Sequence, residues 1–241
     1  MGIPRRVRAV TSFLLSPPKS RPVQNGRDRS EVFKFLNAFA FGMGPTVIGL
    51  DFAFSMPEWF LREKKLGSAR ELWELASREG EQWLAESPPP FWGRKGTHPP
   101  EPPLRWRANE IAIPATAGIS PKSVFQIAGA GAVGTGTIRG LWLLANLSPA
   151  FSIWPFNPPG ERLVVEIYPR LLTGPVKKSD QAHRVAYLDS DRWKMTDSLR
   201  TLAASSEDAF DAAISALVMA EHEDLFANLV QAQDPITLLE G

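Results

Sequence analysis

Apolar residues gather in two short runs that predict buried strands. The first contains Val47, Ile48 and Leu50, and it is bounded by Gly44-Pro45 on one side and Met56-Pro57 on the other. The second spans Leu163 to Ile167 and ends before Pro169. Short runs rich in β-branched residues between turn signals are typical of strands buried in a sheet. A third apolar piece, Val7 to Leu15, is a weaker strand candidate.

Helical spacing of apolar residues predicts four further regions. They are Asp28 to Phe39, Glu58 to Glu86 with breaks at Gly67 and Gly80, Thr137 to Leu147, and Ser206 to about Leu229. Strands separated by helices indicate an α/β protein. Residues 88–103 differ, because they hold seven prolines in sixteen positions. This composition predicts a long ordered loop or lid, inserted into the fold.

Composition narrows the class of protein. An apolar fraction of 44% and a charged fraction of 22% in 241 residues are ordinary for a folded globular chain. Residues 1–25 are basic and poorly defined, and residues 26–241 are expected to form a single domain. The absence of cysteine excludes disulfides, thiolate metal sites and a cysteine nucleophile. No apolar run approaches the roughly 18 residues that span a bilayer, so we expect a soluble, cytoplasmic protein with no membrane contact.

Two acids lie in or beside the predicted strands. Asp51 directly follows the first strand, at the sheet edge where α/β folds place ligands. The alternative is that Asp51 bonds backbone N–H groups of the next turn. Glu166 lies inside the second β-branched run, where an acid is unusual, and it is either functional or ion-paired, with Arg170 as the nearby partner.

A glycine-rich segment resembles a dinucleotide-binding motif. Gly129 to Gly134 spells G-x-G-x-x-G after an expected strand, Ser123 to Ala128. That motif requires an acid about 20 residues further on, and none occurs between Ile111 and Gly160, so dinucleotide binding is disfavoured. The candidate anion-binding residues of this turn and of the proline-rich loop are Gly131, Gly134, Lys122, Arg139 and Arg94. In the alternative, the glycines form only a tight turn, and the loop's aromatic residues pin it to the core.

The last predicted helix carries two acids outside its apolar stripe. Asp208 and Asp211 fall about 60° apart around a helix, so both carboxylates can face one spot. The alternative is helix capping, because Ser205 followed by Asp208 fits a variant of the capping box.

Five segments in this order resemble one family. They are Val47–Pro57, Pro121–Gln126 with the Gly129–Gly140 run, Trp154–Phe156, Val165–Pro169 and Asp208–Ala212. Together they resemble the uncharacterised family of predicted ribonuclease H-like nucleases, the domain of unknown function numbered 429, which is related to RuvC and YqgF. The resemblance covers about Gly26 to the end of the chain.

This resemblance implies a ribonuclease H-like mixed sheet flanked by helices and a metal-dependent nuclease. Asp51, Asp208 and Asp211 would then bind two Mg²⁺ or Mn²⁺ ions, with Glu166 as a further catalytic acid and nucleic acid as the partner. Relatives also have an acid on a first strand, whereas only Asp28 and Glu31 precede Asp51 here. We therefore expect an N-terminal strand region that is incomplete in this sequence. The alternative is a non-catalytic ribonuclease H-like module that binds a nucleotide, a nucleic acid or a protein.

Overall fold

The chain is a mixed α/β protein divided into two compact units. The computed structural model describes residues 10–13, 28–41, 44–113, 119–148 and 150–241. Unit 1 comprises Met1–Asp51 and Glu161–Leu229, and unit 2 comprises Phe52–Gly160 and Val230–Gly241. Each unit therefore combines two segments that are far apart in the sequence, where a single domain from residue 26 was expected. We describe each unit by itself.

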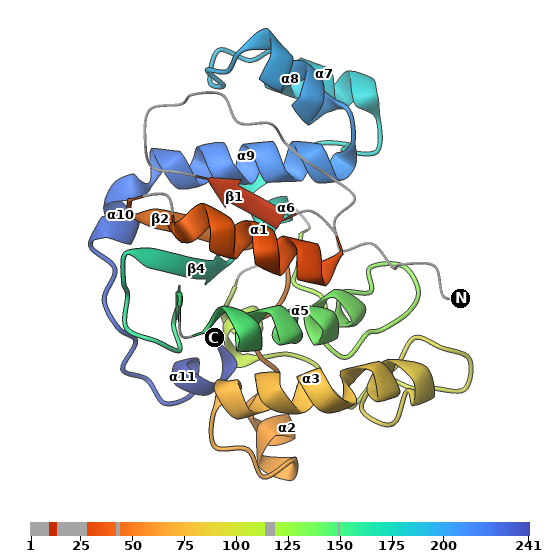
Figure 1. Cartoon of the computed structure of the whole chain (residues 1–241). Coiled ribbons are helices and arrows are strands. Elements are labelled where there is room, and N and C mark those ends of the chain that lie inside the picture. The colour runs from red at the N-terminus through yellow and green to blue at the C-terminus, as the bar shows by residue number, and fades with distance from the viewer. Residues whose placement is uncertain (1–9, 14–27, 42–43, 114–118, 149) are drawn as a thin grey trace. The chain divides into compact units, whose positions relative to one another are not determined.

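A small mixed sheet forms the centre of unit 1 (Figure 1). Strand β2 (Thr46–Leu50) pairs in parallel with β4 (Arg162–Glu166), in the register Thr46↔Arg162 to Leu50↔Glu166. Strand β1 (Val10–Phe13) pairs with β2 in the antiparallel direction. All five residues of β2 are buried, which confirms the strand predicted from its β-branched run. The weaker strand candidate is confirmed in its central four residues.

The helices of unit 1 are α1 (Arg29–Phe41), α6 (Pro169–Thr173), α7 (Gln181–Leu188), α8 (Asp197–Ala204), α9 (Glu207–Glu221) and α10 (Glu223–Ala227). Helix α9 packs against β1, α6 and α8, and Figure 1 shows it lying alongside β1. Its apolar side joins a core with Leu188 and Trp193. The helix predicted to run from Ser206 to Leu229 is too long, because the helix is interrupted at His222, between α9 and α10.

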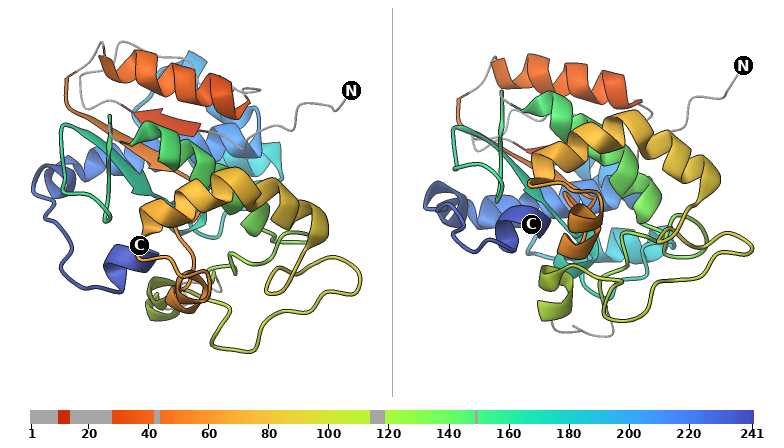
Figure 2. Two further views of the ribbon diagram at one scale, coloured as in Figure 1. Left: turned by 60° about the horizontal axis from the view of Figure 1, so that its bottom comes forward. Right: turned by 90° about the horizontal axis from the view of Figure 1, so that it is seen from below.

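Unit 2 contains α2 (Glu58–Glu63), α3 (Ala69–Glu86), α4 (Ala108–Ala112), α5 (Gly134–Leu147), β3 (Ser152–Ile153) and α11 (Thr237–Glu240). Helices α3 and α5 lie side by side (Figure 2). The break predicted at Gly67 is confirmed, but the break at Gly80 is wrong. A Cβ on Gly80 would lie 2.7 Å from Ile138 Cγ2, so this glycine serves close packing of α3 on α5.

The proline-rich loop is held to unit 2 by its aromatic residues. The Phe91 ring stacks on Trp83 with a centroid distance of 5.6 Å, and its side chain is buried. The Trp92 amide donates to the Phe125 carbonyl at 3.0 Å, and the Ile127 amide donates to the Trp92 carbonyl at 2.8 Å. These bonds form an isolated bridge, so the strand predicted at Ser123 to Ala128 is wrong. Neighbouring prolines lack the donors that a longer ladder needs.

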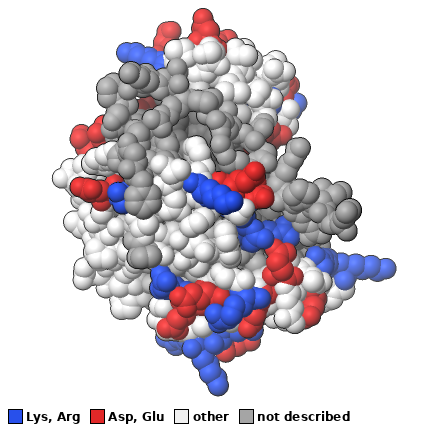
Figure 3. All heavy atoms as spheres, in the orientation of Figure 1, with Lys and Arg blue, Asp and Glu red and all other residues white. Residues whose placement is uncertain are grey.

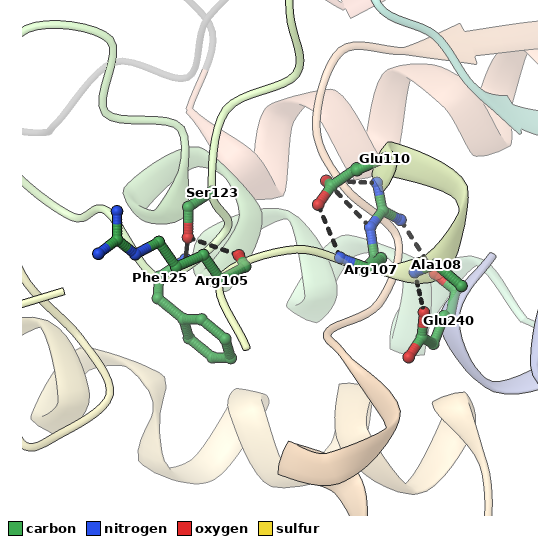
Figure 4. A network of polar contacts seen from close by, with 7 residues as sticks. All are labelled: Arg105, Arg107, Ala108, Glu110, Ser123, Phe125 and Glu240. Atoms are coloured by element: carbon green, nitrogen blue, oxygen red, sulfur yellow. Dashed lines mark hydrogen bonds and ion pairs between the residues drawn. The ribbon is translucent and has the colours of Figure 1, made fainter. Parts of the chain in front are cut away.

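A buried polar network ties the C-terminal helix to unit 2 (Figure 4). The Arg107 side chain is 2% exposed and donates through Nε and Nη2 to Glu110 Oε1, both at 3.1 Å. Its Nη1 donates to the Glu240 carbonyl at 3.0 Å. The Glu240 carboxylate accepts from the amides of Glu58 and Ala108. Nothing in the sequence pattern connects these residues, since about 130 positions separate Arg107 from Glu240.

Candidate functional site

The four predicted catalytic acids all belong to unit 1. Asp51 is exposed and follows β2 directly, at the carboxyl end of the parallel strand pair. Its negative charge lies close enough to Tyr168 to help raise the pKa of that phenol, after the larger effect of burial. Asp51 is therefore placed at the sheet edge where it was predicted, beside the start of α6.

The pleat of the sheet separates Glu166 from the side that α9 covers. A Cβ on Gly49 would lie 2.8 Å from Met219 Sδ, so Gly49 faces α9. Glu166 is the register partner of Leu50 and therefore points to the opposite face from Gly49. Asp51 lies one residue beyond β2, in a bend, so the alternation along the strand does not assign it to either face. Glu166 thus lies on the face of the sheet opposite to α9.

The first two turns of α9 hold the other two acids. The Ser206 side chain caps the helix by accepting from the Ala209 amide at 3.1 Å. Ser205 instead ends α8, so the predicted capping box on Ser205 is wrong by one residue. Asp208 is exposed, whereas Asp211 is half-buried. Because Ser206 performs the capping, neither aspartate is needed for that role.

Asp211 is bound to a lysine that sequence reasoning did not single out. Lys178 Nζ lies 2.5 Å from Asp211 Oδ2, and the two side chains are 16% and 18% exposed. The other carboxylate oxygen, Oδ1, is buried without a hydrogen-bond partner. Burial raises the pKa of Asp211 above its ordinary value, and the ammonium of Lys178 opposes that rise. Thirty-three positions separate the pair, so no local pattern predicts it.

The loop that carries Lys178 is fixed by two arginines. Arg170 Nη1 donates to the Val176 carbonyl at 2.6 Å. Arg184 is buried, and it donates to the carbonyls of Lys178 and Ala204. Arg170 is also the candidate partner of Glu166, and its Nη1 supports this loop. The Lys178 backbone is therefore held in place independently of its ion pair.

The fit of this site to a divalent cation is partial. Carboxylates are the hard oxygen ligands that Mg²⁺ and Mn²⁺ prefer, and Asp51 and Asp208 both expose theirs. Across the described ranges, no group of three or more His, Cys, Asp or Glu side chains is arranged to hold a metal ion. Asp28 and Glu31, the acids that precede Asp51, bond each other's amides at the start of α1. Those two acids therefore cap a helix.

The predicted substrate-binding residues belong to unit 2. The Arg139 guanidinium forms two bonds to the Glu81 carboxylate, at 2.9 and 3.0 Å, and Arg94 donates to the Ala85 carbonyl at 2.8 Å. Both arginines are thus engaged within the unit. The stem of Lys122 runs past Gly131, with its Cε 3.4 Å from where a Cβ would lie.

The glycine-rich segment has a structural use. Gly131 has a φ of +75°, which favours glycine, and a Cβ on Gly134 would lie 2.3 Å from the Val124 carbonyl oxygen. Gly134 starts α5, so its missing side chain lets this helix begin against the preceding turn. These observations match the tight-turn alternative.

Surface charge gives no single-sign region on the visible face. In Figure 3, the basic and acidic side chains of the described residues lie interspersed, as the balance of 27 basic and 26 acidic residues leads one to expect. No helix within the described ranges is long and apolar enough to cross a membrane.

Comparison of the chain with protein-family models, with curated proteins and with solved structures found no significant match.

Proposed function

We propose that this chain is a metal-dependent phosphodiester hydrolase of the ribonuclease H-like superfamily that acts on nucleic acid. The observation that supports it is the position of Asp51, which is exposed at the carboxyl end of a buried parallel strand. Active sites of α/β proteins gather at this edge. Asp208, on the first turn of α9, is a further exposed carboxylate of the same unit.

Two carboxylates suffice for a magnesium site of this kind. Mg²⁺ commonly keeps several waters and binds one or two carboxylates together with the phosphate oxygens of its substrate. The lack of a three-residue cluster among the described residues is therefore compatible with a site that is completed by the substrate. The bound ion would polarise a phosphoryl oxygen and activate a water.

The test compares Asp51→Asn with Asp191→Asn. Asp191 is an exposed acid of the same unit, in the turn between α7 and α8, so it controls for the loss of one surface charge. We expect the wild-type chain to cleave single- or double-stranded DNA or RNA in Mg²⁺ or Mn²⁺, and Asp51→Asn to lower the rate at least 100-fold, the order of an essential ligand's contribution. Equal rates in the two variants would refute the role of Asp51.

A second candidate function is a non-catalytic ribonuclease H-like module that binds a nucleotide, a nucleic acid or a protein. The pairing of Asp211 with Lys178 supports it, because this pairing removes one of the three expected metal ligands. On this reading the wild-type chain cleaves none of the substrates, yet binds fluorescent single-stranded DNA or RNA with an affinity that falls as salt rises. The cleavage assay distinguishes the two functions, because only the first predicts cleavage, and filter binding between 50 and 200 mM salt then tests the second.

A further inference from the structure

The Lys178–Asp211 pair involves one of the three acids that the proposed function would use as metal ligands. Lys178 Nζ contacts Asp211 Oδ2 at 2.5 Å, and Oδ1 is buried from solvent without a partner. A hydrated cation needs a carboxylate oxygen that it can reach. Neither oxygen of Asp211 meets that need in this arrangement, whereas Asp51 and Asp208 are both exposed.

This ion pair is built into unit 1 and differs from a typical surface pair. Both side chains are more than four-fifths buried, and the backbone of the lysine is held by the buried Arg184 while Arg170 holds Val176, two residues before it. Surface pairs are held loosely and gain little, because two long side chains lose entropy when they associate. Here other residues hold the backbone that carries Lys178.

We infer that Lys178 is an internal cation that takes the place of a divalent metal at Asp211, so that Asp211 is a positioning residue for the lysine and not a metal ligand. A lysine ammonium is a compact point charge with three donors. It can neutralise a carboxylate that would otherwise need a metal. The inference deepens the proposed function and rests on it only for the site around Asp51.

The experiment is a Mn²⁺ titration of the full chain, followed by electron paramagnetic resonance of the free ion. Lys178→Met removes the charge and keeps the length of the side chain, and it frees Asp211 Oδ2. We expect this variant to bind one additional Mn²⁺ per chain, or to bind Mn²⁺ at least tenfold more tightly than the wild type. The double variant Lys178→Met, Asp211→Asn should lose that gain. Lys177→Met is the matched control, because Lys177 is the exposed neighbour of Lys178.

A second variant covers the case in which Lys178→Met fails to fold. Asp211→Asn alone should leave wild-type Mn²⁺ binding within twofold, because Asp211 holds the lysine and not the metal. A tenfold loss in Asp211→Asn would overturn the inference, and so would Mn²⁺ binding by a folded Lys178→Met that equals the wild type, including no binding in either. The cleavage assay tests the proposed function separately, which fails if there is no hydrolysis or if hydrolysis does not depend on Asp51. The Mn²⁺ titration tests the role of Asp211, whether or not the chain cleaves nucleic acid.

Discussion

Two glycines in the first turn of α5 have different surroundings. A Cβ on Gly134 would lie 2.3 Å from a backbone oxygen, which a side-chain rotation cannot relieve, whereas a Cβ on Gly136 would meet nothing within 4 Å. We expect Gly134→Ala to lower the free energy of unfolding by about 1–3 kcal/mol through overpacking. Gly136→Ala should raise it by about 0.5–1 kcal/mol, because alanine loses less entropy in a helix.

Urea unfolding followed by tryptophan fluorescence measures both changes, since seven of the eight tryptophans lie in unit 2 with α5. Equal effects of the two substitutions would show that the close approach at Gly134 is not a constraint on the helix.

At the scale of elements, the start of α9 depends on one serine. Ser206 Oγ accepts from the Ala209 amide, while Ser205 Oγ donates to the Leu202 carbonyl within the last turn of α8. Loss of an N-cap side chain costs about 1 kcal/mol, so we expect Ser206→Ala to destabilise unit 1 by that amount. The control Ser205→Ala should change stability by less than about 0.5 kcal/mol. Thermal unfolding followed by far-UV circular dichroism compares them, and the reverse ranking would restore the capping box on Ser205.

The pattern of the chain predicted most elements but not all of their ends. The runs at Val47 and Leu163 predicted β2 and β4, because short runs of β-branched residues between turn signals usually form strands. Gly80 was misread as a break, since the pattern cannot show that α5 lies against it. The Ser123 run failed for a related reason. A strand needs a partner ladder, and among the described residues this run pairs only with a proline-flanked loop, through one bridge.

At the scale of the whole molecule, the C-terminal segment completes unit 2. The two oxygens of the Glu240 carboxylate accept from two backbone amides. In Glu240→Gln, the side-chain NH₂ group would face one of these amide donors. An unsatisfied buried polar group costs about 1–3 kcal/mol, and we expect Glu240→Gln to lower the urea midpoint of the tryptophan signal accordingly. Glu101→Gln, at an exposed acid of the same unit, is the control and should leave that midpoint unchanged. Equal midpoints in the two variants would contradict a structural role for the carboxylate.

Only those site residues that lie next to their structural element in the sequence could be placed from the sequence. Asp51 is adjacent to its strand in the sequence, so its position at the sheet edge followed from the pattern. Lys178, Arg107 and Glu240 act across 33 or more positions, and their partners depend on how the chain returns. Single-sequence patterns report local periodicity, so they cannot pair such residues.

The order of synthesis determines when the two segments of unit 2 become available to each other. Residues 52–160 leave the ribosome after residues 1–51, and about 70 residues of unit 1 follow before Val230–Gly241 appears. At 5–20 residues per second, the 130 positions from Glu110 to Glu240 take roughly 7–26 s to synthesise, and Arg107 and Glu110 lack Glu240 during that time. A nascent chain in that interval exposes amides that the finished unit buries. Chaperones that recognise incomplete domains would therefore meet this protein while its second unit still lacks its last segment.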